Sequence, residues 1–272
     1  VVSQGISGVA CLCYMAKKYP ILRMSREERR LDIHSCRVLC AMGIPMGLQY
    51  SITAIGSIIL QSSVNALGSL YVAAVAAGAK LFQLLACPFD AMGATMATYC
   101  GQNVGACKLD RLGRGIRSCT ALGLGWSLLV LCAMLAFAPQ CAMLFLDPSE
   151  EQLALLVELT ARYTVIQVSF YFPLALVNIV RFSIQGMGFS TFAILAGVLE
   201  MFARTGVATL LVPIFGYTAA CLASPAAWLA ADLFQLPASI FCISRLRKLY
   251  PSVPDNERTA DPAPALLSDP AR

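Results

Sequence analysis

Histidine and charged residues are scarce in this sequence. Its 272 residues include one histidine, His34, and only 13% are Asp, Glu, Lys or Arg. A single imidazole excludes a zinc-finger spacing and argues against a serine and histidine pair that hydrolyses substrates inside the membrane. The 58% hydrophobic content and a mean hydropathy of +0.71 exclude a water-soluble globular protein.

Cysteine pairs and phosphate-binding loops are also missing. The twelve cysteines are scattered singly, without a CxxC motif, so we expect small apolar side chains rather than disulfides. The glycines of GQNVGACK are too close together for a P-loop. We therefore expect no enzyme, no cofactor, no metal and no nucleic acid partner.

Six apolar stretches are the main feature of the chain. A hydrocarbon core of roughly 30 Å needs about 20 residues of helix to cross it. We therefore predict an all-α, polytopic membrane helix bundle with six full transmembrane helices. Residues 1–16 are predicted to be the end of a preceding transmembrane helix that begins outside this sequence. The six predicted spans are residues 38–61, 71–98, 119–137, 155–180, 191–215 and 219–243.

Basic residues occupy alternate connections between these spans. Lys and Arg occur in residues 17–37, after the second span, at Arg181 after the fourth and after the sixth, whereas the opposite connections hold none. The positive-inside rule places the basic connections and both chain ends in the cytoplasm, which fits a plasma (inner) membrane protein. We thus predict a basic cytoplasmic loop at 17–37, a six-helix lobe at 38–250 and a disordered cytoplasmic tail at 251–272.

Charged residues inside the predicted spans are candidates for function. At the centre of a spanning helix each costs on the order of 2.5–3.5 kcal/mol, so those that persist usually face the interior and have partners. The candidates are Lys80, Asp90, Glu158, Arg162, Glu200, Arg204 and Asp232.

The spacing of these residues predicts which can pair within one helix. Glu158 with Arg162, and Glu200 with Arg204, are four residues apart, so each acid can reach the base one turn later. Lys80 and Asp90 lie about 15 Å apart along their helix and cannot pair directly.

Asp232 has no basic residue within a turn of its own helix. Two interpretations of Asp232 and Asp90 stay open. Either carboxylate takes part in ion coupling, or it forms a hydrogen bond between helices or a salt bridge with Lys80 or Arg204.

Two polar stripes have helical spacing. Gln49, Thr53 and Ser57 follow Pro45 on the first span, and Tyr163, Gln167, Tyr171 and Asn178 lie on the fourth. Such stripes can line a wet cavity, or they can hold helices together through hydrogen bonds. Aromatic members favour binding of flat or cationic ligands on the fourth span.

Three segments carry a resemblance to a known family. They are GIPMGLQYSITAIGS, MATYCGQNVGACKLDRLGRGIRS and IQGMGFST. Over residues 38–250 the chain resembles the second lobe of the multidrug and toxin extrusion (MATE) family of antiporters. The resemblance implies twelve helices in two lobes, with a missing N-terminal lobe as a partner and residues 1–16 as the end of the sixth helix.

The resemblance also indicates where ion coupling should occur. Some members carry coupling carboxylates on the seventh and tenth helices, where this sequence has Thr53 and Leu174. The chain departs from that branch, so the resemblance implies a coupling carboxylate in the missing lobe, as in other members.

The predicted function is a secondary active antiporter that exports amphipathic or cationic drugs in exchange for H+ or Na+. Its partners would be membrane lipid and small organic substrates. Rival hypotheses are a flippase for lipid-linked oligosaccharides, which would need inward Arg and Lys, and a membrane enzyme or scaffold. The predicted substrate passage comprises Gln49, Thr53, Gln167, Tyr171 and Asn178, and its electrostatics are set by Asp90, Asp232, Lys80, Glu200 and Arg204.

Overall fold

The computed structural model describes residues 2–19, 32–146 and 152–250. These residues form helices and no strand, and they belong to two compact units, Val1–Ala41 and Met42–Arg272. The predicted tail and most of the predicted basic loop lie outside the described residues, as do Asp147, Glu150 and Glu151. The all-α fold class is confirmed.

The first unit contains helix α1, Val2–Lys18, and the beginning of α2, Ile33–Asn65. Asp32 caps α2, because its carboxylate accepts the backbone N–H groups of His34 and Ser35 at 3.2 and 3.0 Å. The Ser35 hydroxyl and these N–H groups hold the pKa of Asp32 below its usual value.

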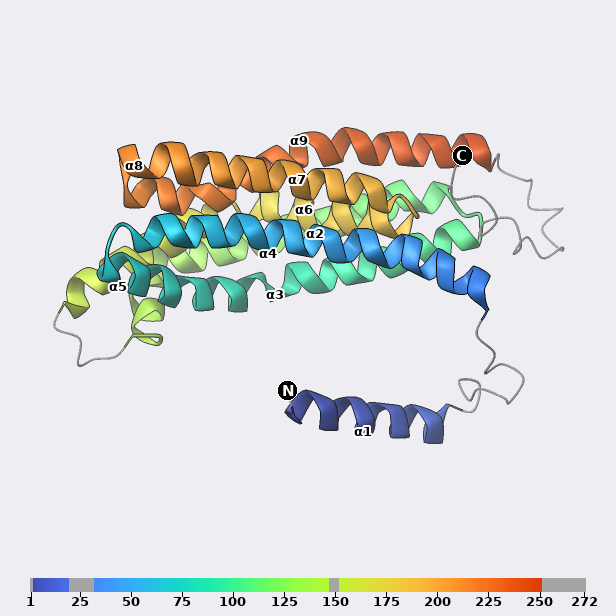
Figure 1. Cartoon of the computed structure of the whole chain (residues 1–272), viewed down its shortest axis with the longest axis horizontal. Helices are drawn as coiled ribbons and strands as arrows, with labels where there is room; N and C mark the ends of the chain where they lie inside the picture. The colour runs from blue at the N-terminus through green and yellow to red at the C-terminus, as the bar shows by residue number, and fades with distance from the viewer. Residues whose placement is uncertain (1, 20–31, 147–151, 251–272) are drawn as a thin grey trace. The chain divides into compact units, whose positions relative to one another are not determined.

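The second unit is a bundle of long antiparallel helices (Figure 1). Among the described residues, five helices are long and apolar enough to cross a membrane, and a bent pair raises the number to six if it counts as one span. The chain is therefore a multi-pass membrane protein. The elements after α2 are α3 Ser69–Gly105, α4 Asp110–Met143, α5 Leu153–Ser169, α6 Tyr171–Gly186, α7 Ser190–Gly206, the π-helix η2 Val207–Leu211, α8 Val212–Phe215 and α9 Tyr217–Leu249.

Each predicted span corresponds to one helix or one broken helix, and the helices extend further than the apolar stretches. The connection between α3 and α4 contains only residues 106–109. Arg111, Arg114 and Arg117 therefore lie on α4, although the sequence interpretation placed them in a loop. Apolar periodicity marks only the hydrocarbon-facing part of a helix, which explains the difference.

The fourth predicted span is broken. Helix α5 ends at Ser169 and α6 begins at Tyr171, with a bend of 50° between them. Pro173 supplies the reason, because a proline lacks an N–H group and its ring clashes with the carbonyl of residue 169 in a continuous helix. The break places Phe170 at the bend.

The core of the second unit is densest where α3 packs against α6. A side chain at Gly186 would place its Cβ 2.3 Å from the carbonyl oxygen of Ala97, so only glycine allows this approach. Tyr171 is fully buried and packs edge-on against Phe82 and Phe89. Small residues at such crossings let membrane helices come close.

Candidate functional site

A buried ion-pair network links α6 and α7 inside the second unit. The Arg181 Nη2 atom lies 2.7 Å from Glu200 Oε2, and the Arg204 Nη2 atom lies 2.8 Å from Glu200 Oε1. All three side chains are at most 8% exposed. One carboxylate thus holds two guanidinium groups, each through a charge-assisted hydrogen bond.

Helix α2 accepts further hydrogen bonds from this network. Arg204 donates through Nη1 to the Ser57 hydroxyl at 3.1 Å and to the Thr53 carbonyl at 3.4 Å. Closer to the start of α2, the side-chain amide of Gln185 on α6 donates to the side-chain oxygen of Gln49 at 2.6 Å. The spacing of the α2 residues at successive helical turns places them on one face, toward α6 and α7.

Asp232 of α9 is the fourth charged member. It is 6% exposed, interacts electrostatically with Arg181 and Glu200, and its Oδ1 atom has no hydrogen-bond partner within the described residues. Gln235, less than one turn later, is fully buried, and neither of its side-chain polar atoms is bonded there. Two guanidinium groups and two carboxylates give this network zero net charge when both acids are ionised.

The sequence analysis found three of these four charged residues. The ion pair between Glu200 and Arg204 is confirmed. Arg181 was placed in a cytoplasmic turn, and that assignment was wrong, since it is 7% exposed and bound to Glu200. The signal was its place between Asn178 and Gln185, three and four residues away on one face of α6.

A second predicted pair does not form. The structure places no ion pair between Glu158 and Arg162, both of which are exposed. Arg162 instead donates to the Thr218 hydroxyl of α9 at 2.9 Å. A partner on a neighbouring helix replaces the one predicted on the same helix.

The fourth-span stripe forms hydrogen bonds with backbone carbonyls. Gln167 donates to the carbonyl of Cys221 on α9 at 3.1 Å, and the Tyr171 hydroxyl donates to that of Phe82 on α3 at 3.0 Å. Asn178 donates to the Leu174 carbonyl of its own helix at 3.2 Å. The first two bonds join helices, which is the second role foreseen for these stripes. Their role in a substrate passage stays a prediction.

Lys80 and Asp90 lie apart from the network. Both are exposed on α3, and neither forms an ion pair in the part of the chain that the structure describes. Gln83 and Thr98 lie on the same face at helical spacing and are exposed as well. This exposed polar face of α3 contrasts with the buried faces that meet around Glu200.

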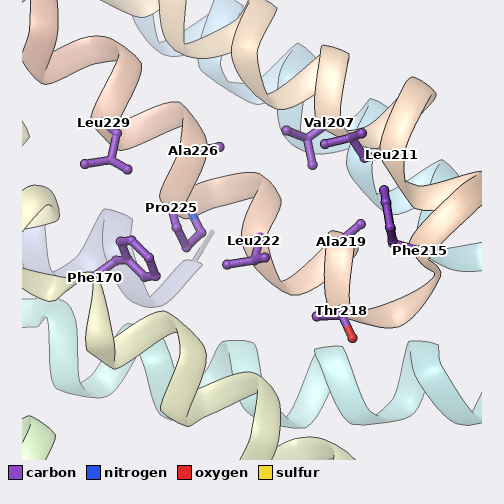
Figure 2. Close-up of a pocket in the computed structure, with 10 residues that line it drawn as sticks. All are labelled: Phe170, Val207, Leu211, Phe215, Thr218, Ala219, Leu222, Pro225, Ala226 and Leu229. Atoms are coloured by element: carbon purple, nitrogen blue, oxygen red, sulfur yellow. The ribbon is translucent and has the colours of Figure 1, made fainter.

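An apolar cavity of about 590 Å³ adjoins the π-helix η2 (Figure 2). Figure 2 shows the aromatic rings of Phe170 and Phe215 at opposite ends of the lining, with the Thr218 hydroxyl at its edge. The π-helix begins three residues after Arg204, and such segments often mark functional sites. The cavity is lined by Phe170, Val207, Leu211, Phe215, Thr218, Ala219, Leu222, Pro225, Ala226 and Leu229.

The described residues contain neither a group of metal ligands nor a disulfide. Among residues 2–19, 32–146 and 152–250, no three His, Cys, Asp or Glu side chains group as a metal site requires. All twelve cysteines are free. The notable chemistry of the site is therefore the charge network itself.

Comparison with known proteins gives a family and a fold. The family model MatE matches residues 45–210. A search of the curated proteins finds no match.

Solved structures are similar over most of the chain. A MATE protein in complex with MaL6 gives a TM-score of 0.78 at 17% identity, covering 85% of this chain and 52% of that one. The Vibrio cholerae MATE transporter VcmN in its bent form gives 0.78 at 18%, covering 92% and 55%. A MOP superfamily transporter from Pyrococcus furiosus gives 0.62 at 18%, covering 82% and 48%. The chain thus spans about half the length of these proteins and shares their fold.

Proposed function

Because the chain belongs to the multidrug and toxin extrusion (MATE) family, we propose that it forms the second lobe of a secondary active antiporter. The transporter exports amphipathic or cationic drugs and other xenobiotics in exchange for H+ or Na+. It lies in the plasma membrane with the basic connections in the cytoplasm. One observation carries the proposal: Asp232 lies buried near two guanidinium groups that share the single carboxylate of Glu200 inside a membrane lobe.

Asp232 supports ion coupling through its place in that network. A proton or Na+ bound to this carboxylate removes the negative charge opposite Arg181 and leaves the buried charges unbalanced by one unit. The ion pairs of Glu200 continue to tie α6 to α7, whereas the electrostatic attraction between α6 and α9 weakens. Ion binding therefore favours a different packing of α9, which is what an ion-driven conformational change needs.

The predicted passage residues fit a substrate that is part polar and part apolar. We propose that Lys80 and Asp90 face the passage from the exposed side of α3, and that Gln49 and Thr53, which contact α6 and α7 in this structure, border it from α2. Gln167, Tyr171 and Asn178 support that wall from α5 and α6. Asp90 would attract a cationic group, and the cavity near η2 offers room for an apolar one.

A first lobe completes this passage in our proposal. Charged side chains such as those of Lys80 and Asp90 are energetically costly when they face lipid. Both should therefore face a polar partner in the assembled transporter. The matched part of this chain covers 52% and 55% of two solved relatives, which supports a partner lobe about as large as the matched part.

Ethidium efflux from cells that express the full-length gene tests the proposal. The proton gradient and the sodium gradient are collapsed in separate experiments. Efflux should stop in the experiment that removes the coupling ion's gradient. The Asp232→Asn variant should accumulate ethidium like cells without the gene. The matched control is Glu158→Gln, an exposed acid with no ion pair in the described residues, which should export normally. Efflux that ignores both gradients removes the antiport proposal.

The flippase alternative requires inward cations without partners, because lipid-linked sugars carry phosphates. Arg181 and Arg204 are the deep bases of the described lobe interior, and both are bound to Glu200. Lys80 is then the base of the proposed passage that forms no ion pair in the described residues, and we keep antiport as the proposed function.

A further inference from the structure

A second cavity lies between α3 and α4 at the end where basic residues gather. Its volume is about 560 Å³, and it combines two guanidinium groups, several hydroxyl groups and an apolar wall. Helix α3 contributes Thr95, Met96 and Tyr99, and α4 contributes Arg111, Arg114, Gly115, Ser118, Cys119 and Leu122.

The lining of this cavity has a polar and an apolar end. Along α4, Arg111, Ser118 and Leu122 lie on one helical face, with the arginine outermost and the leucine deepest. The rise from Arg111 to Leu122 is about 16 Å. This length matches the step from phosphate level into the hydrocarbon of one leaflet, since the polar region on each side of a bilayer is roughly 5–8 Å thick.

Tyr99 shapes the cavity between the two helices. Its hydroxyl donates to the backbone carbonyl of Arg111 at 3.2 Å. Its ring covers Gly115, where a Cβ atom would come within 2.2 Å of the ring. The tyrosine thereby fixes the first turn of α4 beside α3 and keeps the arginine end of the cavity in place.

The described lining of this cavity contains no carboxylate. Neither Arg111 nor Arg114 forms an ion pair in the part of the chain that the structure describes. Asp110, the neighbouring acid, extends toward Arg247 of α9 at 3.9 Å. Two cations therefore lie above an apolar wall without a negative partner among the described residues, and an anionic amphiphile complements both parts.

We propose that this cavity binds the head group of an anionic phospholipid. The lipid phosphate pairs with Arg111 and Arg114, and Thr95 and Ser118 face the glycerol oxygens. The first methylene groups of an acyl chain lie along Cys119 and Leu122, the latter 67% exposed. Basic pockets between membrane helices at the cytoplasmic side are suited to this role. The binding is independent of the proposed transport.

Native mass spectrometry of the purified full-length protein in detergent tests the site. Phosphatidylglycerol should bind more tightly than phosphatidylcholine with the same acyl chains. The double variant R111Q/R114Q should weaken phosphatidylglycerol binding about tenfold or more, because it removes both guanidinium groups that form charge-assisted hydrogen bonds with the phosphate. The control K108Q/R117Q removes the same charge from exposed residues outside the lining and should change binding less than about threefold.

Further arms distinguish a phospholipid site from a site for free phosphate and from attraction to the general positive charge of this end. Excess inorganic phosphate should leave the lipid bound, and Leu122→Asn should weaken phosphatidylglycerol binding while the arginines remain. The variant R111K/R114K keeps both positive charges and should retain most phosphatidylglycerol binding. This result would show that the two positions can be substituted without loss of the folded protein. Equal losses in R111Q/R114Q and K108Q/R117Q, equal binding of both lipids, or complete displacement by phosphate would each overturn the proposal.

Discussion

Two groups of charged residues on the membrane helices differ in burial. Arg181, Glu200 and Arg204 are buried and bound to one another, with Asp232 buried near them, whereas Lys80 and Asp90 are exposed on α3. A buried charge must find its partner within the lobe, because an isolated charge in a medium of low dielectric is very costly. An exposed charge in a membrane lobe must find its partner outside it. The first group therefore holds the lobe together, and the second indicates where the lobe meets something polar.

The packing of α3 explains why its charges stay outside. Its buried face is occupied by Phe89 and by close approaches at Gly78 and Gly93, where the rings of Tyr163 and Phe182 fill the space that a side chain would need. At Gly78 and Gly93 a side chain of any kind would have to displace an aromatic ring. Lys80, Gln83, Asp90 and Thr98 lie on the exposed face of α3 instead.

The largest expected effect follows from removing Glu200. The Glu200→Gln variant removes the carboxylate that binds both Arg181 and Arg204 and leaves only Asp232 near Arg181, so the free energy of unfolding in detergent micelles should fall by about 3–5 kcal/mol. The denaturation midpoint measures this change. Glu158→Gln, which replaces an exposed acid with no ion pair among the described residues, is the matched control and should unfold like the parent protein. A Glu200→Gln protein as stable as the parent would abolish the contrast between the two groups.

Much of this arrangement could be predicted from the sequence. Apolar length and the alternation of basic connections give the number of spans, and i, i+4 spacing gives the bond between Glu200 and Arg204. Spacing within a helix reports only local neighbours. It therefore missed the contact of Arg181 with Glu200 across the turn between α6 and α7, and it wrongly paired Glu158 with Arg162.

The positions of Asp232 and Lys80 show the same limit. Whether a polar residue turns inward depends on which helices pack against it, and that is a property of the tertiary fold. Asp232 meets Arg181 because α9 packs on both α6 and α7. Lys80 has no such neighbour within the described lobe and stays exposed. The basic cavity between α3 and α4 was missed for a related reason, because its two arginines, Arg111 and Arg114, were assigned to a loop.

A smaller effect is expected for the ion pair outside the network. Asp110 and Arg247 are 83% and 56% exposed, and their charged atoms are 3.9 Å apart. A double-mutant cycle of Asp110→Asn and Arg247→Gln should give a coupling energy of about 0.2–1 kcal/mol that declines with added salt. The equivalent cycle on Glu200 and Arg204 should give several times more. Equal coupling at the two places would mean that burial does not set the strength of these pairs.

The smallest effect on stability is expected on the exposed face of α3. Lys80→Gln and Asp90→Asn remove charges that have no ion-pair partner in the described lobe. The free energy of unfolding, obtained from the denaturation curve, should therefore change by no more than about 0.5 kcal/mol. Ethidium efflux should nevertheless fall in both variants if the face lines the passage. Lys108→Gln and Asp110→Asn make the same chemical changes outside the predicted spans and should leave efflux intact. A midpoint that falls as far as in Glu200→Gln would assign Lys80 and Asp90 to the internal scaffold, because only a charge with a partner inside the lobe can stabilise the lobe alone.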